Sequence, residues 1–234
     1  MTLLPRIFAS AFASLVIVPA IAADLTAPAE APEAPPIFFV HAGAFGEFPV
    51  TNAQPTGGGA FANISNVAIR PVYSLALEAG YFVTPNIAIA LSEGVAPIAH
   101  LKATGFTQEA LFGTNLLGSV REGSIRLLLQ YHFTQFGAFQ PYVGAGGSYF
   151  VNLGNISDGI LQNFYVDQNF AFLVQAGADY MFTKNWGVFI DGKKAFFSTD
   201  AGGTVFLPFV GSVPVRSHIE LDPWVASAGV TFKY

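Results

Sequence analysis

Apolar and polar residues alternate along most of this chain with a period of two, which is typical of β-strands whose two faces meet different surroundings. Residues 73–83 show the pattern clearly, because every second residue is apolar or aromatic while the opposite face carries Glu78. The last eight residues alternate in the same way and end on Tyr234, with Val230 and Phe232 on the same face. Chain ends usually fray in water, so a terminal strand that displays aromatic residues indicates a face in contact with lipid.

Eight segments of about ten residues carry this alternation, and a tilted strand of that length crosses a bilayer. The connections between them alternate between short turns and long stretches rich in Gly, Asn, Pro and Ser, and the strand count is even, as expected for a closed barrel. A soluble β-sandwich has no reason to sort its loops by length. We therefore predict an all-β fold, an eight-stranded antiparallel transmembrane β-barrel with short periplasmic turns, long external loops and a periplasmic N-terminus. The predicted strands are residues 37–48, 72–83, 86–96, 124–133, 141–151, 169–182, 186–197 and 218–234.

The composition agrees with a membrane protein, since 52% of the 234 residues are hydrophobic and only 11% are charged. The only apolar run that approaches the length of a membrane-spanning helix is N-terminal, and it follows a short basic stretch and precedes the small residues Ala20 and Ala22. We expect residues 1–22 to be a signal peptide, the short apolar core disfavouring an uncleaved anchor. Residues 23–36, rich in Pro, Ala and Glu, should form an extended periplasmic linker, and residues 37–234 the barrel in a bacterial outer membrane.

The parity of each strand separates a lipid-facing side from a lumen-facing side. Glu78 in lipid would cost several kcal/mol, so its face must be the lumen. Charged groups in a narrow eight-stranded interior should pair with one another, and we expect His41 and His132 to be hydrogen-bond partners there. The predicted polar plug consists of Glu78, Arg126, Gln130, Gln175, Asp179, Asp191 and Lys193. The predicted ligand-binding residues, toward the outer half of the lumen, are Phe45, Leu128, Phe150, Leu173 and Phe197.

Other kinds of chemistry find little support in the sequence. A net charge of −5 argues against nucleic acid. The four histidines lack metal-ligand spacing, and we expect neither a metal nor a cofactor. His100, His218 and Asp222 could serve an acyl-transfer site near the outer rim, but no nucleophile is marked by its neighbours, so we do not expect an enzyme.

Two prolines near the outer ends of predicted strands leave two interpretations open. Proline cannot donate to the strand ladder, so Pro97 and Pro223 could each mark a local break in the wall through which an apolar ligand leaves sideways into the bilayer. The simpler interpretation is that both prolines end their strands.

Several segments resemble the outer membrane protein W family. These are F-F-V-H-A-G at residues 38–43, L-L-L-Q-Y-H-F at 127–133, P-Y-V-G-A-G-G-S-Y at 141–149, Q-A-G-A-D-Y-M-F-T-K-N-W at 175–186 and L-D-P-W-V at 221–225. The resemblance implies an eight-stranded barrel with a role in passing small apolar molecules across the outer membrane. The C-terminal residues also resemble the signal by which the barrel assembly machinery recognises its clients, carried here by Ser227, Gly229, Phe232 and Tyr234.

We thus expect an integral outer-membrane barrel that contacts lipid, binds small hydrophobic or amphipathic molecules in its outer lumen and facilitates their passage. The alternative is a non-transporting structural or interaction barrel whose external loops bind a partner. A water-filled porin is disfavoured, because side chains fill the lumen of an eight-stranded barrel. The sequence carries no signal for an oligomeric state or for the identity of the ligand.

Overall fold

The computed structural model describes residues 35–57, 66–94, 97–104, 113–207 and 209–234. The predicted signal peptide and all but the last two residues of the predicted linker lie outside this part of the chain. Among the described residues, no helix combines the length and the apolar character that a transmembrane helix needs.

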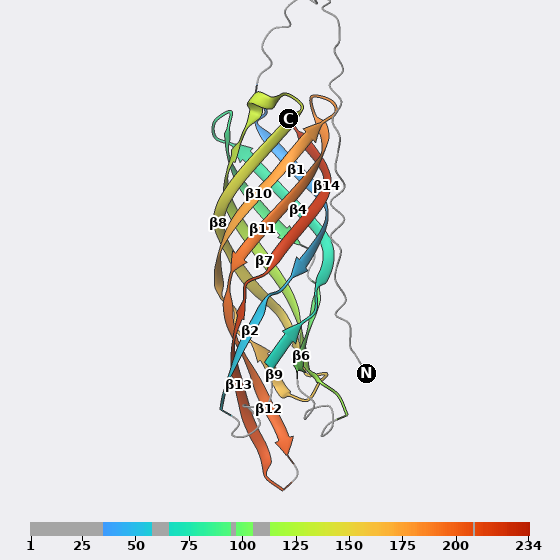
Figure 1. Cartoon of the computed structure of the whole chain (residues 1–234), viewed down its shortest axis with the longest axis vertical. Helices are drawn as coiled ribbons and strands as arrows, with labels where there is room; N and C mark the ends of the chain where they lie inside the picture. Colours follow the sequence, from blue (N-terminus) through green and yellow to red (C-terminus); the bar gives the residue numbers. More distant parts are fainter. Residues whose placement is uncertain (1–34, 58–65, 95–96, 105–112, 208) are drawn as a thin grey trace, which may run out of the picture. The chain divides into compact units, whose positions relative to one another are not determined.

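Eight of the strands form a closed antiparallel ring, in which β1 pairs with β4 on one side and with the last strand, β14, on the other (Figure 1). Going around the ring from β1, each strand pairs with the next through β4, β5, β7, β8, β10 and β11 to β14. This confirms the predicted eight-stranded barrel. The strands are β1 (Phe38–Phe48), β4 (Val72–Phe82), β5 (Ile87–Gly94), β7 (Leu116–His132), β8 (Phe139–Ile156), β10 (Phe170–Met181), β11 (Trp186–Phe196) and β14 (Trp224–Lys233).

The two faces of the wall follow the parity of the sequence. Leu75, Leu127 and Phe172 are 64%, 58% and 55% exposed on the outer face, whereas Glu78 and Asp179 are buried inside. Such a surface would be unfavourable in water but suits hydrocarbon. The alternation therefore places the apolar residues where lipid is and the charged residues where they can pair.

The first and the last strand of the barrel are joined by backbone hydrogen bonds at the side of the short turns. The amides of Ile37 and Phe38 donate to the carbonyl of Tyr234, and Tyr234 donates back to Phe38. One short turn contains η2 (Thr134–Phe136), a single turn of 3₁₀-helix. The C-terminal residues that resemble an assembly signal thus lie in the closing strand of the barrel.

The long connections were predicted as external loops. The structure shows that they contain further strands. β3 (Asn66–Ile69) and β6 (Ile98–Thr104) extend the barrel sheet along the outer part of β7. β2 (Thr51–Gly57), β9 (Gln162–Val166), β12 (Ser198–Leu207) and β13 (Gly211–Leu221) form a second, four-stranded sheet with the order β2, β13, β12, β9. In Figure 1 the β12–β13 hairpin projects at the end opposite the C-terminus.

The last predicted segment, residues 218–234, requires a correction. The chain breaks at Asp222 and Pro223, so residues up to Leu221 belong to β13 and only the remainder belongs to β14. Proline lacks the amide proton that a continuous strand would donate, and at this break the chain passes from the second sheet into the barrel.

The external strands enclose an apolar core of their own. Its buried side chains come from β2, β3, β6, β7, β9, β12 and β13 and from residue 161 before β9. They are Ala53, Val67, Ala99, Leu101, Ala103, Leu117, Val120, Leu161, Phe164, Val166, Ala201, Val205 and Ile219. Phe150, Ile69 and Leu221 pack against this core and also line the lumen below, so one apolar region continues from the external strands into the barrel.

Candidate functional site in the lumen

Three carboxylates in the half of the lumen nearer the short turns are bound by two lysines. Lys193 Nζ lies 2.5 Å from Asp191 Oδ1 and 3.2 Å from Glu78 Oε2. Lys233 Nζ lies 2.7 Å from Asp179 Oδ2. All five side chains are less than a tenth exposed, so each charge needs its partner.

A histidine joins the two halves of this charge network. His41 Nε2 is 2.9 Å from Asp179 Oδ1, and His41 Nδ1 is 3.5 Å from Glu78 Oε1. The imidazole stacks on Phe189, with ring centroids 4.3 Å apart. Since both ring nitrogens face carboxylates, the arrangement favours the protonated imidazolium.

Amides and a tyrosine satisfy the remaining oxygens. Gln130 Nε2 donates to Glu78 Oε1 at 2.8 Å, Gln175 Nε2 donates to Asp191 Oδ2 at 2.6 Å, and the Tyr142 hydroxyl donates to Asp191 Oδ2 at 3.0 Å. Gln130 Oε1 also lies 3.0 Å from His132 Nε2. We call this network the polar floor: His41, Glu78, Gln130, His132, Tyr142, Gln175, Asp179, Asp191, Lys193 and Lys233.

A glycine makes room for the largest side chain of the polar floor. A Cβ atom at Gly177 would lie 2.5 Å from Tyr142 Cζ and Oη, closer than non-bonded atoms approach. Tyr142 is only 1% exposed, and the same Cβ would also lie 2.7 Å from the backbone oxygen of Ile190. The small residue on β10 therefore lets the tyrosine on β8 lie across the lumen.

Six of the seven predicted plug residues belong to the polar floor, and Arg126 differs from the expectation. Its Nη2 lies 3.6 Å from Glu47 Oε2, because Arg126 stands four residues further along β7 toward the outer end than Gln130. The sequence reasoning did not include Lys233 or Tyr142 in the plug. Parity could have found Lys233, since it shares the lumen face of the last strand with Thr231.

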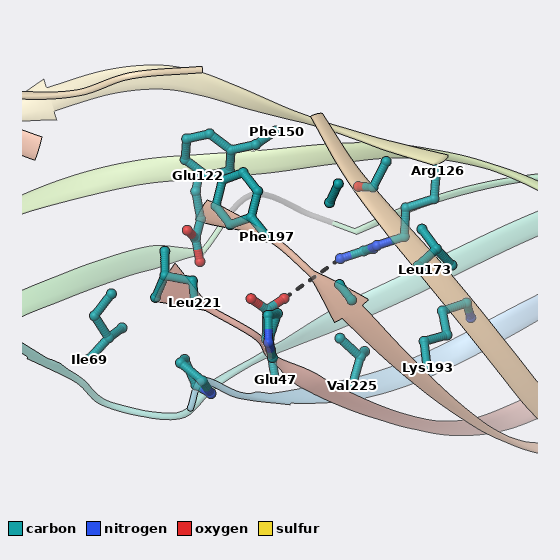
Figure 2. Close-up of a pocket in the computed structure, with 15 residues that line it drawn as sticks. Glu47, Ile69, Glu122, Arg126, Phe150, Leu173, Lys193, Phe197, Leu221 and Val225 are labelled. Atoms are coloured by element: carbon teal, nitrogen blue, oxygen red, sulfur yellow. Dashed lines mark ion pairs between the residues drawn. The ribbon is translucent and has the colours of Figure 1, made fainter. Parts of the chain in front are cut away.

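Beyond the polar floor, toward the external strands, lies a cavity of about 60 Å³ that we call the outer cavity (Figure 2). Apolar side chains form most of its wall, and charged groups reach in from three strands. Its lining residues are Glu47, Pro49, Ile69, Glu122, Arg126, Ser148, Phe150, Ala171, Leu173, Lys193, Ala195, Phe197, Leu221, Pro223 and Val225.

A second, smaller cavity of about 40 Å³ shares four of these residues. Glu47, Glu122, Arg126 and Phe150 line both spaces, and Pro97 lines only the smaller one. The two cavities are therefore neighbours around one charged cluster.

The five predicted ligand-binding residues distribute unequally over these spaces. Phe150, Leu173 and Phe197 line the outer cavity, and the rings of Phe150 and Phe197 lie with centroids 5.5 Å apart. Phe45 lines the smaller cavity. Leu128 is 1% exposed, packs in the cluster that contains Phe39 and Leu173, and lines neither cavity.

The residues considered for acyl-transfer chemistry lie in three separate places. His100 Nδ1 is 2.7 Å from Ser119 Oγ, whose hydroxyl donates to Asp158 Oδ2 at 2.9 Å. His218 Nδ1 is 2.9 Å from Asp200 Oδ1, and Asp222 Oδ1 accepts a hydrogen bond from the amide of Phe197. Ser119 is fully buried, so its hydroxyl serves as a structural link between His100 and Asp158.

The two prolines differ in their surroundings. At Pro223 the wall stays hydrogen-bonded, because the Ala195 amide donates to the Pro223 carbonyl and the Leu221 amide to that of Phe197. Pro97 lines the smaller cavity beside Gly94, and its carbonyl accepts a hydrogen bond from the Glu122 amide of β7. The structure thus favours a strand end at Pro223, where the wall itself is intact.

The barrel matches solved outer-membrane proteins. The crystal structure of OprG from Pseudomonas aeruginosa superposes with a TM-score of 0.75 at 18% identity, covering 85% of this chain and 96% of that one. At this identity the match shows the fold.

Sequence relatives include outer-membrane proteins. An uncharacterised outer-membrane protein, y4mB, of Sinorhizobium fredii is 36% identical over 160 residues, covering 68% of this chain but only 64% of the relative. The outer membrane protein AlkL of Ectopseudomonas oleovorans is 33% identical over 178 residues, covering 76% of this chain and 73% of AlkL. The dibenzothiophene metabolism operon protein PahQ of Pseudomonas aeruginosa is 26% identical over 174 residues, covering 74% of each chain.

A family model agrees with these matches and with the resemblance noted in the sequence. The model of the OmpW family matches residues 37–234, which include all eight strands of the barrel. The chain therefore belongs to the OmpW family and is a β-barrel protein of the outer membrane.

Proposed function

We propose that this barrel binds small hydrophobic or amphipathic molecules in its outer cavity and facilitates their passage across the outer membrane without covalent chemistry. The observation that carries the proposal is an apolar cavity directly above a closed, charged floor. Phe150, Leu173 and Phe197 offer contacts to an apolar solute. The external apolar core continues to the cavity through Ile69 and Leu221, which gives such a solute a path inward.

The polar floor makes a straight passage through the barrel unfavourable. An apolar solute would have to separate the ion pairs around Asp179 and Asp191 in a narrow lumen, at the cost of unpaired buried charges. A sideways route is supported by the position of Pro97, which lines the smaller cavity and cannot donate a hydrogen bond to a strand ladder. We propose that the solute leaves the cavity on this side into the bilayer.

The outer cavity is too small to hold a whole hydrocarbon chain as it stands. Phe150 and Phe197 are only partly buried, and their side chains can turn aside to enlarge the space. The family match supports the same role, and the relative PahQ is a dibenzothiophene metabolism operon protein, which connects it with an apolar aromatic compound.

Uptake by intact cells tests the proposal. Cells that carry the barrel should take up an uncharged apolar solute faster than cells without it. Leu173→Arg should remove this gain, because the guanidinium places a charge in the apolar wall of the cavity. Phe206→Arg is the matched control, since Phe206 lies 58% exposed near the end of β12. Equal uptake by cells with the wild-type barrel, with Leu173→Arg and without the barrel would contradict the proposal.

A second function, binding of a partner by the external strands, is favoured by one observation. The β12–β13 hairpin exposes Phe206, Phe209 and Val210 at its tip, and Phe209 is fully exposed. Isolated apolar side chains at the end of a projecting hairpin suit a partner contact. Loss of cell-surface binding in Phe209→Ser, with solute uptake unchanged, would favour this function.

The route to the membrane is a further part of the proposal. Residues 1–22 would direct export, residues 23–36 would tether the barrel in the periplasm, and Ser227, Gly229, Phe232 and Tyr234 would be read by the barrel assembly machinery. Phe232 and Tyr234 support this, because they lie on the lipid-facing side of β14, where an assembly factor can reach them.

A further inference from the structure

The outer cavity contains two carboxylates for one available cation. Figure 2 shows Glu47 and Glu122 pointing into the cavity from different strands, with Arg126 reaching toward Glu47 from the far side. The Arg126–Glu47 pair is the ion pair drawn there, at 3.6 Å. Within the described part of the chain, Glu122 has no cation at ion-pairing distance.

The other cation in the wall is already bound. Lys193 lines the outer cavity, but in Figure 2 its nitrogen points away from both glutamates. It pairs with Asp191 and Glu78 of the polar floor. Lys193 therefore does not compensate the charge of Glu122.

The polar floor supplies no surplus positive charge from below. Its three carboxylates, Glu78, Asp179 and Asp191, already contact Lys193, Lys233 and His41. A ligand in the outer cavity thus meets two carboxyl groups and a single guanidinium that is already paired, in a space where charges are poorly screened.

We infer that the outer cavity selects its ligand by charge. It takes an uncharged amphiphile that carries a hydrogen-bond donor at one end, such as a primary alcohol or a phenol, and it rejects the carboxylate anion of the same chain length. The inference rests on the proposed function and names the substrate class of the same site.

Each part of such a ligand has a counterpart in the cavity. The donor group can hydrogen-bond to the Glu122 carboxylate, which accepts but does not donate when ionised. The hydrocarbon contacts Phe150, Leu173 and Phe197. A carboxylate head would find no free cation, because Arg126 is already paired, and it would be repelled by the Glu47 carboxylate, so the cavity discriminates by repulsion as well as attraction.

Uptake of three matched solutes by intact cells tests the inference. Decanol, decanoate and decylammonium share one hydrocarbon chain and differ in the charge of the head group. Initial uptake is compared for the wild-type barrel, Glu122→Gln, Glu47→Gln and the double variant, with cells lacking the barrel as background. Glu93→Gln is the matched control, because Glu93 lies on β5 beside Ile125 but is exposed on the outer face.

The expected result is a change in the order of the three solutes. With the wild-type barrel, decanoate should be taken up more than about tenfold more slowly than decanol. The double variant should bring decanoate to within about threefold of decanol, because it removes both carboxyl groups and frees Arg126 to pair with the head group. Decylammonium uptake should fall in the same variant, whereas Glu93→Gln should change none of the three rates.

Two outcomes would overturn the inference, and they differ. In the first outcome, the wild-type barrel takes up decanol above background, decanoate is taken up at the same rate, and the glutamine variants change neither rate. Charge selection is then wrong while the proposed function stands. If no solute exceeds background in any cell, both fail. Electrophoretic mobility of unheated samples confirms that each variant is folded.

Discussion

The polar floor and the outer cavity lie in one lumen between the same eight strands, yet their side chains pack differently. In the floor, every carboxylate contacts a lysine or a histidine, and Tyr142 fills the remaining space. In the outer cavity, aromatic and aliphatic side chains surround open volume and a partly paired charge cluster. The comparison indicates that pairing closes one half of the barrel and incomplete packing leaves the other half open to a ligand.

Two histidine–aspartate pairs show how burial decides the value of a contact. His41 Nε2 and Asp179 Oδ1 are 2.9 Å apart with both side chains buried. His218 Nδ1 and Asp200 Oδ1 are also 2.9 Å apart, but these side chains are 48% and 42% exposed. Water screens the second pair, so the same geometry should contribute much less to stability.

The largest expected effect is the loss of a buried charge partner. Asp179→Ala leaves both Lys233 and His41 without their closest carboxylate and should lower the free energy of unfolding by about 3–5 kcal/mol. Asp200→Ala should change it by less than about 1 kcal/mol. Urea unfolding of the reconstituted protein, followed by electrophoretic mobility, measures both variants. Equal losses would break the distinction between the buried and the exposed pair.

A smaller effect should follow from overpacking the polar floor. Gly177→Ala places a methyl group against the buried Tyr142 ring and should cost about 1–3 kcal/mol, because the ring cannot move aside. Gly192→Ala is the matched control, since a Cβ there meets no atom closer than 3.8 Å. The same unfolding assay compares them, and a Gly177→Ala barrel as stable as Gly192→Ala would show that the floor is loosely packed.

The sequence predicted the wall of the barrel well because the wall follows local rules. Strand parity depends only on neighbours two residues apart, so it placed Glu78 and Asp179 inside and Leu75 and Phe172 outside. The burial of these residues confirms that assignment. The apolar outer lumen was anticipated for the same reason.

Features that depend on contacts across the lumen were harder to predict. Which lumen residues meet is set by the stagger of the strands, so the sequence did not indicate that Arg126 pairs with Glu47, and Glu47 and Glu122 were not among the predicted residues. The external strands have weaker alternation, and their pairing, such as β13 with β2, joins residues far apart in the chain. The sequence indicated a strand end or a local break at Pro223, but it did not indicate that the chain changes from one sheet to the other there.

The smallest change in stability is expected for a substitution in the outer cavity. This substitution also tests whether the cavity, unlike the polar floor, is open enough to affect uptake. Phe197→Leu shortens a partly buried side chain and should change the free energy of unfolding by no more than about 1 kcal/mol, since few contacts are lost. It should still raise the uptake of a bulky apolar solute about threefold, because it widens the space beside Phe150. Phe206→Leu, on the exposed end of β12, is the control and should leave uptake unchanged. A loss of stability as large as that of Gly177→Ala, without faster uptake, would mean that Phe197 is part of a packed core and that the outer half of the lumen is as closed as the floor.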